Sequence, residues 1–451
     1  MRKRWVPGAR EALFFFGSWL GFRLVSDWPR GVMRSGSGVA PWMENLSYIG
    51  LVGWIAPAIL ALLIIRKPHQ AFAGDPVLRA HLLLSVFQLW PLANSTLQFG
   101  MEGLLAGVYI WTVSLSFLVM YSLGVFIGQN AFAADDATLT KTSAYIVAFL
   151  GFPSIALALV QIASGTGIVI DGVNRVFGGT SSPNVLGAVM LVQLMIAFAA
   201  GTKTLRNSLI WYLALGGIAL VGAFSLSGFV CVAFAGTIFW VVQSFNNGKL
   251  NISPLWMTLL IVAVSAVFYF VGAEVAGRFG ELGNDSNSLT WRTATWADSI
   301  SYLDSWTMFF FGGGLGFDHL ALPEEPHNEW LRVLLEMGVI GLLIFILPIL
   351  RLLLAMRELL KTPDQSIRLR AVGIISATAG LCLWAAVDSV LRTAPSALCL
   401  WSAAGLLVGN ARALRIERLR GAAVENGRNK ATPPVADAHD HSGLPEHPEF
   451  K

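Results

Sequence analysis

Apolar runs of about 20 residues recur along almost the whole of this 451-residue chain, and they constrain its fold more than any other feature. An α-helix of that length crosses a hydrocarbon layer about 30 Å thick. Hydrophobic residues make up 55% of the chain and charged residues 13%, whereas an ordinary soluble domain has roughly 25% charged residues. The sequence therefore predicts an all-α polytopic membrane protein.

The apolar runs, together with the prolines, glycines and charges that interrupt them, predict about twelve transmembrane helices. The longest loop between them covers residues 276–329, and we expect it to be structured, with short helices. We assign residues 1–410 to one multi-pass transmembrane domain and residues 411–451 to a disordered tail, which is basic and then rich in Pro, His and Glu. The predicted spans lie near 12–26, 47–65, 79–98, 104–128, 143–163, 184–200, 207–224, 226–243, 255–275, 330–355, 370–389 and 396–410.

The lysines and arginines are distributed unevenly between the two ends of these helices. The side that carries the basic N-terminus collects 23 of the 31 Lys and Arg residues, and the positive-inside rule makes that side cytoplasmic. An even number of spans returns the C-terminus to the same side, and the first apolar run lacks a signal-peptide cleavage site. The loops near 164–183 and 276–329 are then external. The eight outward residues are all arginines: Arg23, Arg30, Arg34, Arg175, Arg278, Arg292, Arg332 and Arg392.

One histidine stands where the long external loop meets an apolar helix, in Pro326-His327-Asn328. Asn328 suits the N-cap of that helix and Glu329 its first turn, and we expect an extended backbone at His327. These assignments leave the histidine itself unexplained. An imidazole can accept a proton from a hydroxyl group, although a surface histidine without a role is the simpler alternative.

Two external arginines, Arg175 and Arg292, each lie in a loop that returns to a helix. Guanidinium groups are permanently charged and bind phosphate oxygens in pairs, so the two predict a clamp for a diphosphate. Arg175 precedes a Gly/Ser-rich turn and a predicted helix cap at Asn184, while a membrane-surface position is the alternative for Arg292. We interpret the glycines at 312–314 as a tight turn, because they lack the spacing of a nucleotide-binding loop.

Four stretches in this order resemble the O-antigen ligase and O-antigen polymerase superfamily of bacterial inner-membrane glycosyltransferases. They are RVFGGTSSPNVLG at 175–187, SLTWR at 288–292, GGGLGF at 312–317 and PHNEWLRVLLEMGVIGL at 326–342. The resemblance covers residues 165–350 by motif and the whole chain by topology. The start of the helix at Pro-His-Asn is its most specific part.

The resemblance implies a GT-C-like, metal-independent and inverting enzyme without a cofactor. It would take a glycan from an undecaprenyl-diphosphate-linked donor on the periplasmic face and pass it to lipid A core or to a lipid-linked glycan. By this resemblance Arg175 and Arg292 bind the diphosphate and act in catalysis with His327, and we add Asn184 and Asn328 as candidate substrate contacts. The implied location is the bacterial inner membrane, among membrane lipids, with both termini cytoplasmic, a periplasmic site and no nucleic-acid partner.

Several alternatives remain open from the sequence. A polymerase of lipid-linked repeat units shares the same motifs, although the arginine-to-glycine spacing of some polymerases is not reproduced. A transporter would suit the polar residues Glu102 and Asp388 inside apolar runs, and a non-catalytic scaffold would leave the arginines without a purpose. No motif assigns the acidic residue that orients His327. The candidates are Asp171, Asp298, Asp304, Glu324 and Glu325.

Overall fold

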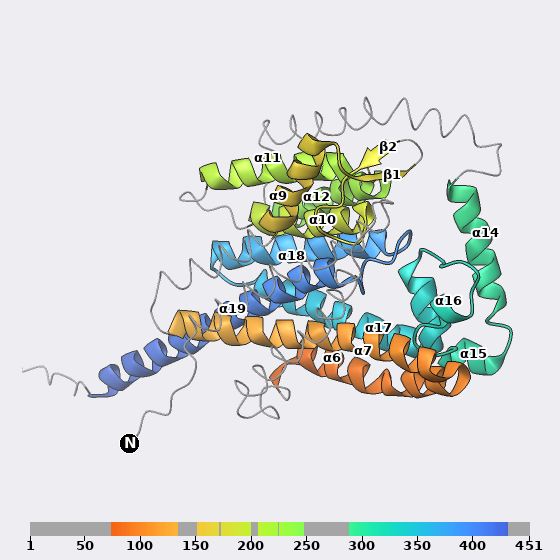
Figure 1. The fold of residues 1–451 in the computed structure, drawn as a ribbon. Helices are drawn as coiled ribbons and strands as arrows, with labels where there is room; N and C mark the ends of the chain where they lie inside the picture. The colour runs from red at the N-terminus through yellow and green to blue at the C-terminus, as the bar shows by residue number, and fades with distance from the viewer. Residues whose placement is uncertain are drawn as a thin grey trace, which may run out of the picture.

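The computed structural model describes residues 74–133, 151–170, 173–199, 206–223, 225–247 and 288–431. Within these residues all of the regular secondary structure is helical apart from one short hairpin, and the helices lie side by side as a bundle (Figure 1). Five helical stretches are long and apolar enough to cross a membrane, which confirms an all-α membrane protein. They are Pro76–Gln129, Ser227–Phe245, Glu329–Leu359, Gln365–Trp384 and Pro395–Ile416.

The described helices fall at nine of the twelve predicted spans, and three further apolar helices are shorter than a full span. The predicted spans near 12–26, 47–65 and 255–275 lie outside the described residues. The helices are α6 (Pro76–Phe87), α7 (Leu89–Ala133, broken at Gly100), α9 (Phe152–Ser164), α10 (Pro183–Ala199), α11 (Arg206–Ala223), α12 (Leu226–Asn247), α17 (Glu329–Leu359), α18 (Gln365–Trp384) and α19 (Ala394–Ala431).

Helix α10 forms the centre of the bundle, since almost all of its side chains are buried. Helices α11, α12 and α18 pack around it, and α17 packs against α6 and α18. The closest pair is α7 with α19, where Gly124 and Gly128 face Gly405 and Gly409 so that the two backbones touch. Such small-residue contacts replace hydrophobic attraction where both the interior and the surroundings are apolar.

The segment 288–320 contains three short helices, α14 (Ser288–Ser301), α15 (Trp306–Phe311) and α16 (Phe317–Leu320). They gather at one end of the bundle, at the right of Figure 1, while the hairpin of β1 (Ile168–Ile170) and β2 (Val173–Arg175) lies near the top of that view, beside α12. The strands are antiparallel, with Ile168 opposite Arg175. Helix α17 begins at this end and α18 finishes there, whereas Arg357 and Arg368 lie toward the opposite ends of their helices and Arg412 lies near the end of the apolar stretch Pro395–Ile416 of α19.

The backbone of α17 is interrupted at Gly338, where φ is 65° and ψ is −174°. The break frees carbonyl groups, and the glycine-rich turn supplies their donors: Gly313 N–H donates to Leu335 O (2.8 Å) and Gly314 N–H to Glu336 O (3.0 Å). These N–H groups already have partners and are not available to a phosphate. The structure therefore supports the interpretation of 312–314 as a tight turn rather than as a phosphate-binding loop.

Helix α19 continues to Ala431, so residues 411–431, where we expected disorder, are helical in the structure. Residues 432–451 lie outside the described part, and the division into a domain of 1–410 and a tail of 411–451 stays a prediction.

We predict that Gly338→Ala destabilises the protein. The torsion angles at Gly338 lie in a region that is almost exclusive to glycine, which costs on the order of 1–3 kcal/mol for another residue. An added Cβ would also lie 2.2 Å from the carbonyl carbon of Phe310. The measurement is the free energy of unfolding in detergent. The control is Gly217→Ala in α11, where an added Cβ meets nothing within 4 Å, and which should be neutral or stabilising by at most about 1 kcal/mol. Equal stabilities of the two variants would contradict the prediction.

Candidate functional site

His327 lies in the last turn of loop before α17, with its side chain 41% exposed. Its φ is 44°, so the expectation of an extended backbone was wrong: the residue takes the left-handed conformation, in which histidine is one of the more frequent non-glycine residues. The expected cap is confirmed, because Asn328 Oδ1 accepts the N–H of Leu331 (3.1 Å). Asn328 therefore fixes the helix start that presents His327.

Asp388 is the acidic residue that faces His327, with Oδ1 3.6 Å from Nδ1 of the imidazole. We expected this aspartate inside a membrane span, but α18 ends at Trp384 and Asp388 lies in the turn that follows. The turn is closed by hydrogen bonds from the N–H groups of Val387 and Asp388 to Trp384 O. Sequence reasoning missed Asp388 as a partner of His327 because the apolar run continues through Ala385–Val387.

Asn184 connects Asp388 to Arg175. Its Nδ2 donates to Asp388 Oδ2 (2.6 Å), and its Oδ1 accepts from Arg175 Nη2 (3.1 Å) and Ser225 Oγ (3.0 Å). The expectation that Asn184 caps a helix was wrong: it stands inside α10, and Ser182 Oγ accepts the N–H of Val185 instead. The amide is thus fixed in orientation by one acceptor and two donors.

Arg175 is positioned at the end of β2 by the elements around it. Its Nε donates to Ala223 O (3.0 Å) at the end of α11. The turn that follows Arg175 is held by Gln161 of α9, whose Oε1 accepts the N–H groups of Phe177 (3.0 Å) and Gly178 (2.9 Å). Gln161 is buried, and we had not singled it out from the sequence.

Arg292 reaches the same turn from α14, since its Nη1 donates to Val387 O (2.8 Å). Its Nε is buried without a hydrogen-bond partner among the described residues. A buried guanidinium donor without an acceptor is unusual and suits a site that binds an anion.

The turn at 387–388 therefore brings together residues that are far apart in the sequence. Arg292 binds the Val387 carbonyl, while Asp388 contacts both His327 and the amide that holds Arg175. Two permanently positive arginines lie near one carboxylate, Asp388, so this group of residues carries excess positive charge. It can therefore accommodate an anion next to the imidazole of His327.

A buried ion-pair network lies directly behind this turn. Arg392 pairs with Glu329 (2.5 Å) and with Glu336, and Arg332 pairs with Asp318 (2.6 Å). All three carboxylates are inaccessible to solvent. Burial acts to lower the pKa of Arg392, but Glu336 and Glu329 outweigh it and raise that pKa above its usual range. We expected Glu329 in the first helical turn, and it is there, with the added and unpredicted role of binding Arg392.

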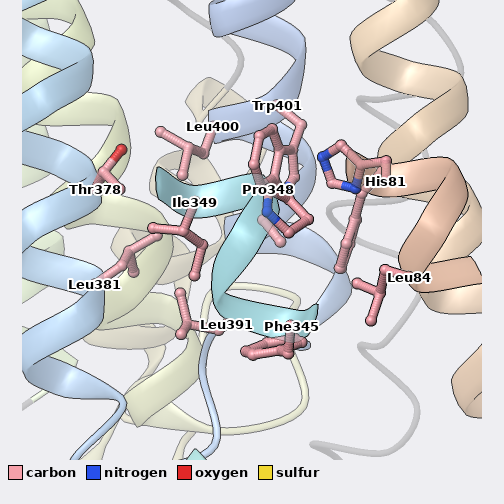
Figure 2. A pocket seen from close by; sticks show the side chains of 12 residues that line it. His81, Leu84, Phe345, Pro348, Ile349, Thr378, Leu381, Leu391, Leu400 and Trp401 are labelled. Atoms are coloured by element: carbon pink, nitrogen blue, oxygen red, sulfur yellow. The ribbon is translucent and has the colours of Figure 1, made fainter. Parts of the chain in front are cut away.

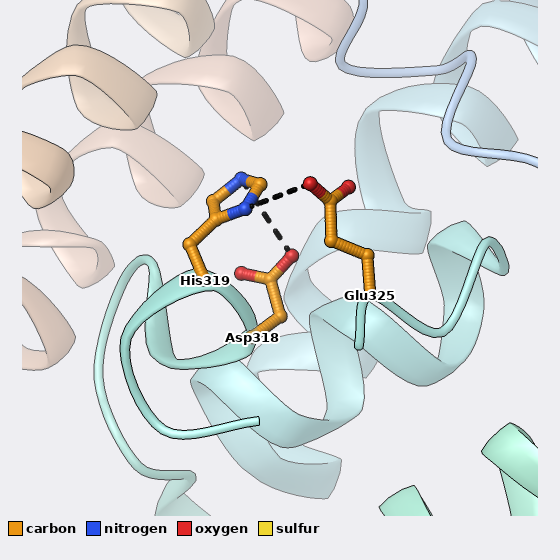
Figure 3. Close-up of side chains that lie close together, drawn as sticks. All are labelled: Asp318, His319 and Glu325. Carbon is orange, nitrogen blue, oxygen red and sulfur yellow. Dashed lines mark ion pairs between the residues drawn. The ribbon is translucent and has the colours of Figure 1, made fainter. Parts of the chain in front are cut away.

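Asp318, His319 and Glu325 form the one cluster with metal-ligand spacing in the described part of the chain (Figure 3). Nδ1 of His319 lies 3.1 Å from Glu325 Oε1, and this contact lowers the pKa of Glu325 to about 2. The same contact raises the pKa of His319, against the effects of burial and Arg332. However, Arg332 contacts both Asp318 and His319 Nε2 (2.7 Å), so a guanidinium already takes the place of a cation. We assign the cluster to ion pairing.

A small apolar cavity lies inside the helix bundle (Figure 2). His81 and Trp401 line it edge to face, with ring centres 4.2 Å apart, together with side chains such as Phe345 and Pro348 of α17. Both ring nitrogens of His81 lack partners among the described residues. The cavity shares no residue with the group of Arg175, Arg292 and His327.

Residues 211–346 match a family model described as O-antigen ligase. The matched segment begins in α11 and runs into α17, so it contains Arg292 and His327. No curated protein matches the chain.

We predict that Arg392→Leu destabilises the protein by roughly 3–5 kcal/mol, because it leaves Glu329 and Glu336 buried without their cation. Unfolding in detergent measures the loss. The matched control is Lys361→Ala, which removes an ion pair with Glu358 in which both side chains are about two-thirds exposed. No measurable change is expected there. Wild-type stability of the Arg392 variant would show that the network is not needed for the fold.

Proposed function

We propose that this chain is a member of the O-antigen ligase superfamily, which the family match at residues 211–346 supports. We propose further that it transfers a glycan from undecaprenyl diphosphate to an acceptor hydroxyl on the periplasmic face of a bacterial inner membrane. The family match supports glycan transfer of the ligase or polymerase type. The observation that carries the finer proposal is the convergence of Arg175, Arg292 and His327 on the turn at 387–388.

In the proposed reaction the two arginines hold the diphosphate of the donor. Each is anchored by hydrogen bonds to the protein, Arg175 through Asn184 and Arg292 through Val387. A guanidinium placed in advance stabilises negative charge as it develops on the leaving diphosphate. The arginines can do this as fixed cations, so no step of the proposal requires a metal ion.

His327 acts as the general base. It takes the proton of the acceptor hydroxyl, whose oxygen forms a bond to the anomeric carbon while the bond from that carbon to the phosphate oxygen breaks. Undecaprenyl diphosphate leaves with the electron pair, and the single displacement inverts the anomeric configuration. Asp388 lies on the Nδ1 side of the ring, which favours a proton on Nδ1 and leaves Nε2 to accept.

The helix directions support a periplasmic site. The site lies where α17 begins and α18 ends. Four of the five basic residues of these helices, Arg351, Arg357, Arg368 and Arg370, lie toward the other ends, and the fifth, Arg332, is ion-paired with buried Asp318. Positive residues collect on the cytoplasmic side of membrane proteins, which supports a site on the opposite face. The proposed location is the inner membrane, with both termini in the cytoplasm.

A ligase is the leading reading and a polymerase of lipid-linked repeat units is the alternative, since both would use the same three residues. Loss of a ligase leaves long unattached chains on the lipid carrier, and loss of a polymerase leaves single repeat units attached to the acceptor. A transporter is less favoured by the structure, because Asp388 stands in a turn beside His327 rather than within a helix.

The deciding experiment compares His327→Ala with Arg292→Ala in cells that depend on this protein for surface glycan. His327→Ala should lower transfer by about 10²- to 10⁴-fold, the usual contribution of a general base. It should still co-purify with undecaprenyl diphosphate glycan, whereas Arg292→Ala should lose both transfer and retained donor. Immunoblots control for protein amount. Normal surface glycan in the His327 variant at normal protein level would refute the catalytic role.

Asp388→Asn tests the orientation of the base. An amide facing Nδ1 can favour the opposite tautomer, so kcat should fall on the order of 10²-fold or more while KM for the lipid donor changes little. The control is Asp298→Asn on α14, whose side chain forms no hydrogen bond or ion pair with the site residues in the described part of the chain and which should keep wild-type kinetics. A KM effect without a kcat effect would assign Asp388 to donor binding instead.

A further inference from the structure

Trp291 forms one wall of the space beside His327. It precedes Arg292 on α14, and the centre of its ring lies 5.5 Å from the centre of the imidazole, with the two planes inclined by 56°. The ring is partly exposed to solvent. It therefore offers an aromatic surface immediately next to the proposed base.

Glu324 holds this ring in place. Trp291 Nε1 donates to Glu324 Oε2 (2.6 Å), and Thr295 Oγ1 donates weakly to the same oxygen (3.4 Å). The other carboxylate oxygen, Oε1, has no hydrogen bond within the described part of the chain. The pair thus combines a fixed ring with an acceptor oxygen that is exposed at the edge of the site.

The charge of Glu324 is not neutralised by its neighbours. Both of its hydrogen-bond donors are uncharged, and no Lys or Arg of the described residues forms an ion pair with it. The next residue, Glu325, contacts His319 instead. Glu324 therefore contributes a carboxylate without an ion-pair partner beside Trp291, whereas Arg175 and Arg292 contribute positive charge near the 387–388 turn.

The acceptor must place its hydroxyl against the imidazole, so its sugar ring lies next to the residues that flank His327. The apolar C–H face of a sugar packs on an aromatic ring, and its hydroxyl groups donate to carboxylate oxygens. A phosphate or carboxylate group on that sugar would face the unneutralised Glu324, and like-charge contacts reject a ligand more effectively than missing contacts do.

We propose that Trp291 and Glu324 form the acceptor-sugar subsite and select an uncharged or amino sugar over a phosphorylated or uronic-acid sugar at the attacked position. The assignment rests on the proposed function, because it identifies the ring beside His327 with the acceptor. It adds the chemical class of that ring and the two residues that determine it.

Saturation-transfer NMR on the purified full chain in lipid nanodiscs tests the subsite without requiring turnover. The probes are methyl glucoside, methyl glucosaminide, methyl glucuronide and glucose 6-phosphate. Wild-type protein should transfer saturation to the ring C–H protons of the first two probes, and at least several-fold less to the two anionic ones. Trp291→Ala should abolish the signal, while Glu324→Gln should keep it and bring the anionic probes up to the level of the neutral ones.

Trp306→Ala is the matched control, since Trp306 lies in the same loop region and is 78% exposed, and its loss should leave every signal unchanged. Trp291→Phe keeps a ring and serves if the alanine variant does not fold; it should retain binding of methyl glucoside. Equal signals from wild type and Trp291→Ala, no signal from any probe in wild type, or unchanged discrimination in Glu324→Gln would each overturn the proposal.

His327→Ala separates this proposal from the proposed function. Its saturation transfer should match wild type, because the subsite remains. Full glycan transfer by His327→Ala would refute the catalytic proposal whatever the binding data show, whereas normal sugar binding by Trp291→Ala would refute the subsite alone.

Discussion

The buried pairing of Arg392 with Glu329 and Glu336 is the interaction on which the geometry of the site depends. Glu329 binds the 385–393 segment at both of its ends: its backbone N–H donates to Ala385 O (2.8 Å), and its carboxylate accepts from the side chain and backbone N–H of Arg392. The turn with Val387 and Asp388 lies in the chain between these two contacts. Because His327 stands two residues before Glu329, the same glutamate sets the distance between the imidazole and Asp388. Removing charges from water costs free energy, which the close ion pairs and hydrogen bonds of the network offset. The network also fixes one arrangement of the two chain segments.

Most residues of the proposed site lie where helices are interrupted, and the backbone groups freed at these interruptions form hydrogen bonds with neighbouring segments. The break at Gly338 exposes carbonyl groups that the glycine-rich turn at 312–314 covers with its N–H groups. The turn after Arg175 is similarly covered by Gln161. In an apolar environment an unpaired backbone group is too costly to leave, so broken helices require such partners. Since the backbone donors of these turns already have partners within the fold, the proposed binding of the diphosphate is left to side chains. Arg292 contacts the 387–388 turn directly, and Arg175 is connected to it through Asn184.

The sequence predicted what depends on local pattern and missed what depends on long-range pairing. Apolar length located the helices, and the positions of Arg175, Arg292 and His327 at helix junctions marked them as candidates. Asp388 was misplaced because Ala385-Ala386-Val387 continues the apolar run of α18, and nothing local signals that the helix has ended. Glu329 looked like an ordinary first-turn acid, although its partner Arg392 is 63 residues away. We expected Asn184 to cap a helix, but it lies inside α10 and its side-chain amide donates a hydrogen bond to Asp388, which is distant in the sequence. The left-handed backbone at His327 also had no local signal beyond the residue type.

Asp388 couples the two halves of the proposed reaction. One carboxylate oxygen faces His327, and the other accepts from Asn184, which in turn binds Arg175. As the imidazole gains the acceptor proton, a positive charge forms beside Oδ1; as the donor bond breaks, negative charge grows on the diphosphate held by the arginines. Both changes are stabilised by groups that the protein has fixed in advance, so little reorganisation is needed when the bond is transferred. The carboxylate also offsets part of the mutual repulsion of the cations before substrate arrives. A neutral residue at 388 could preserve the hydrogen bond to Asn184 but could not balance the positive charge that forms on His327. In the proposed mechanism this accounts for an acid, rather than an amide, at the position between His327 and Asn184.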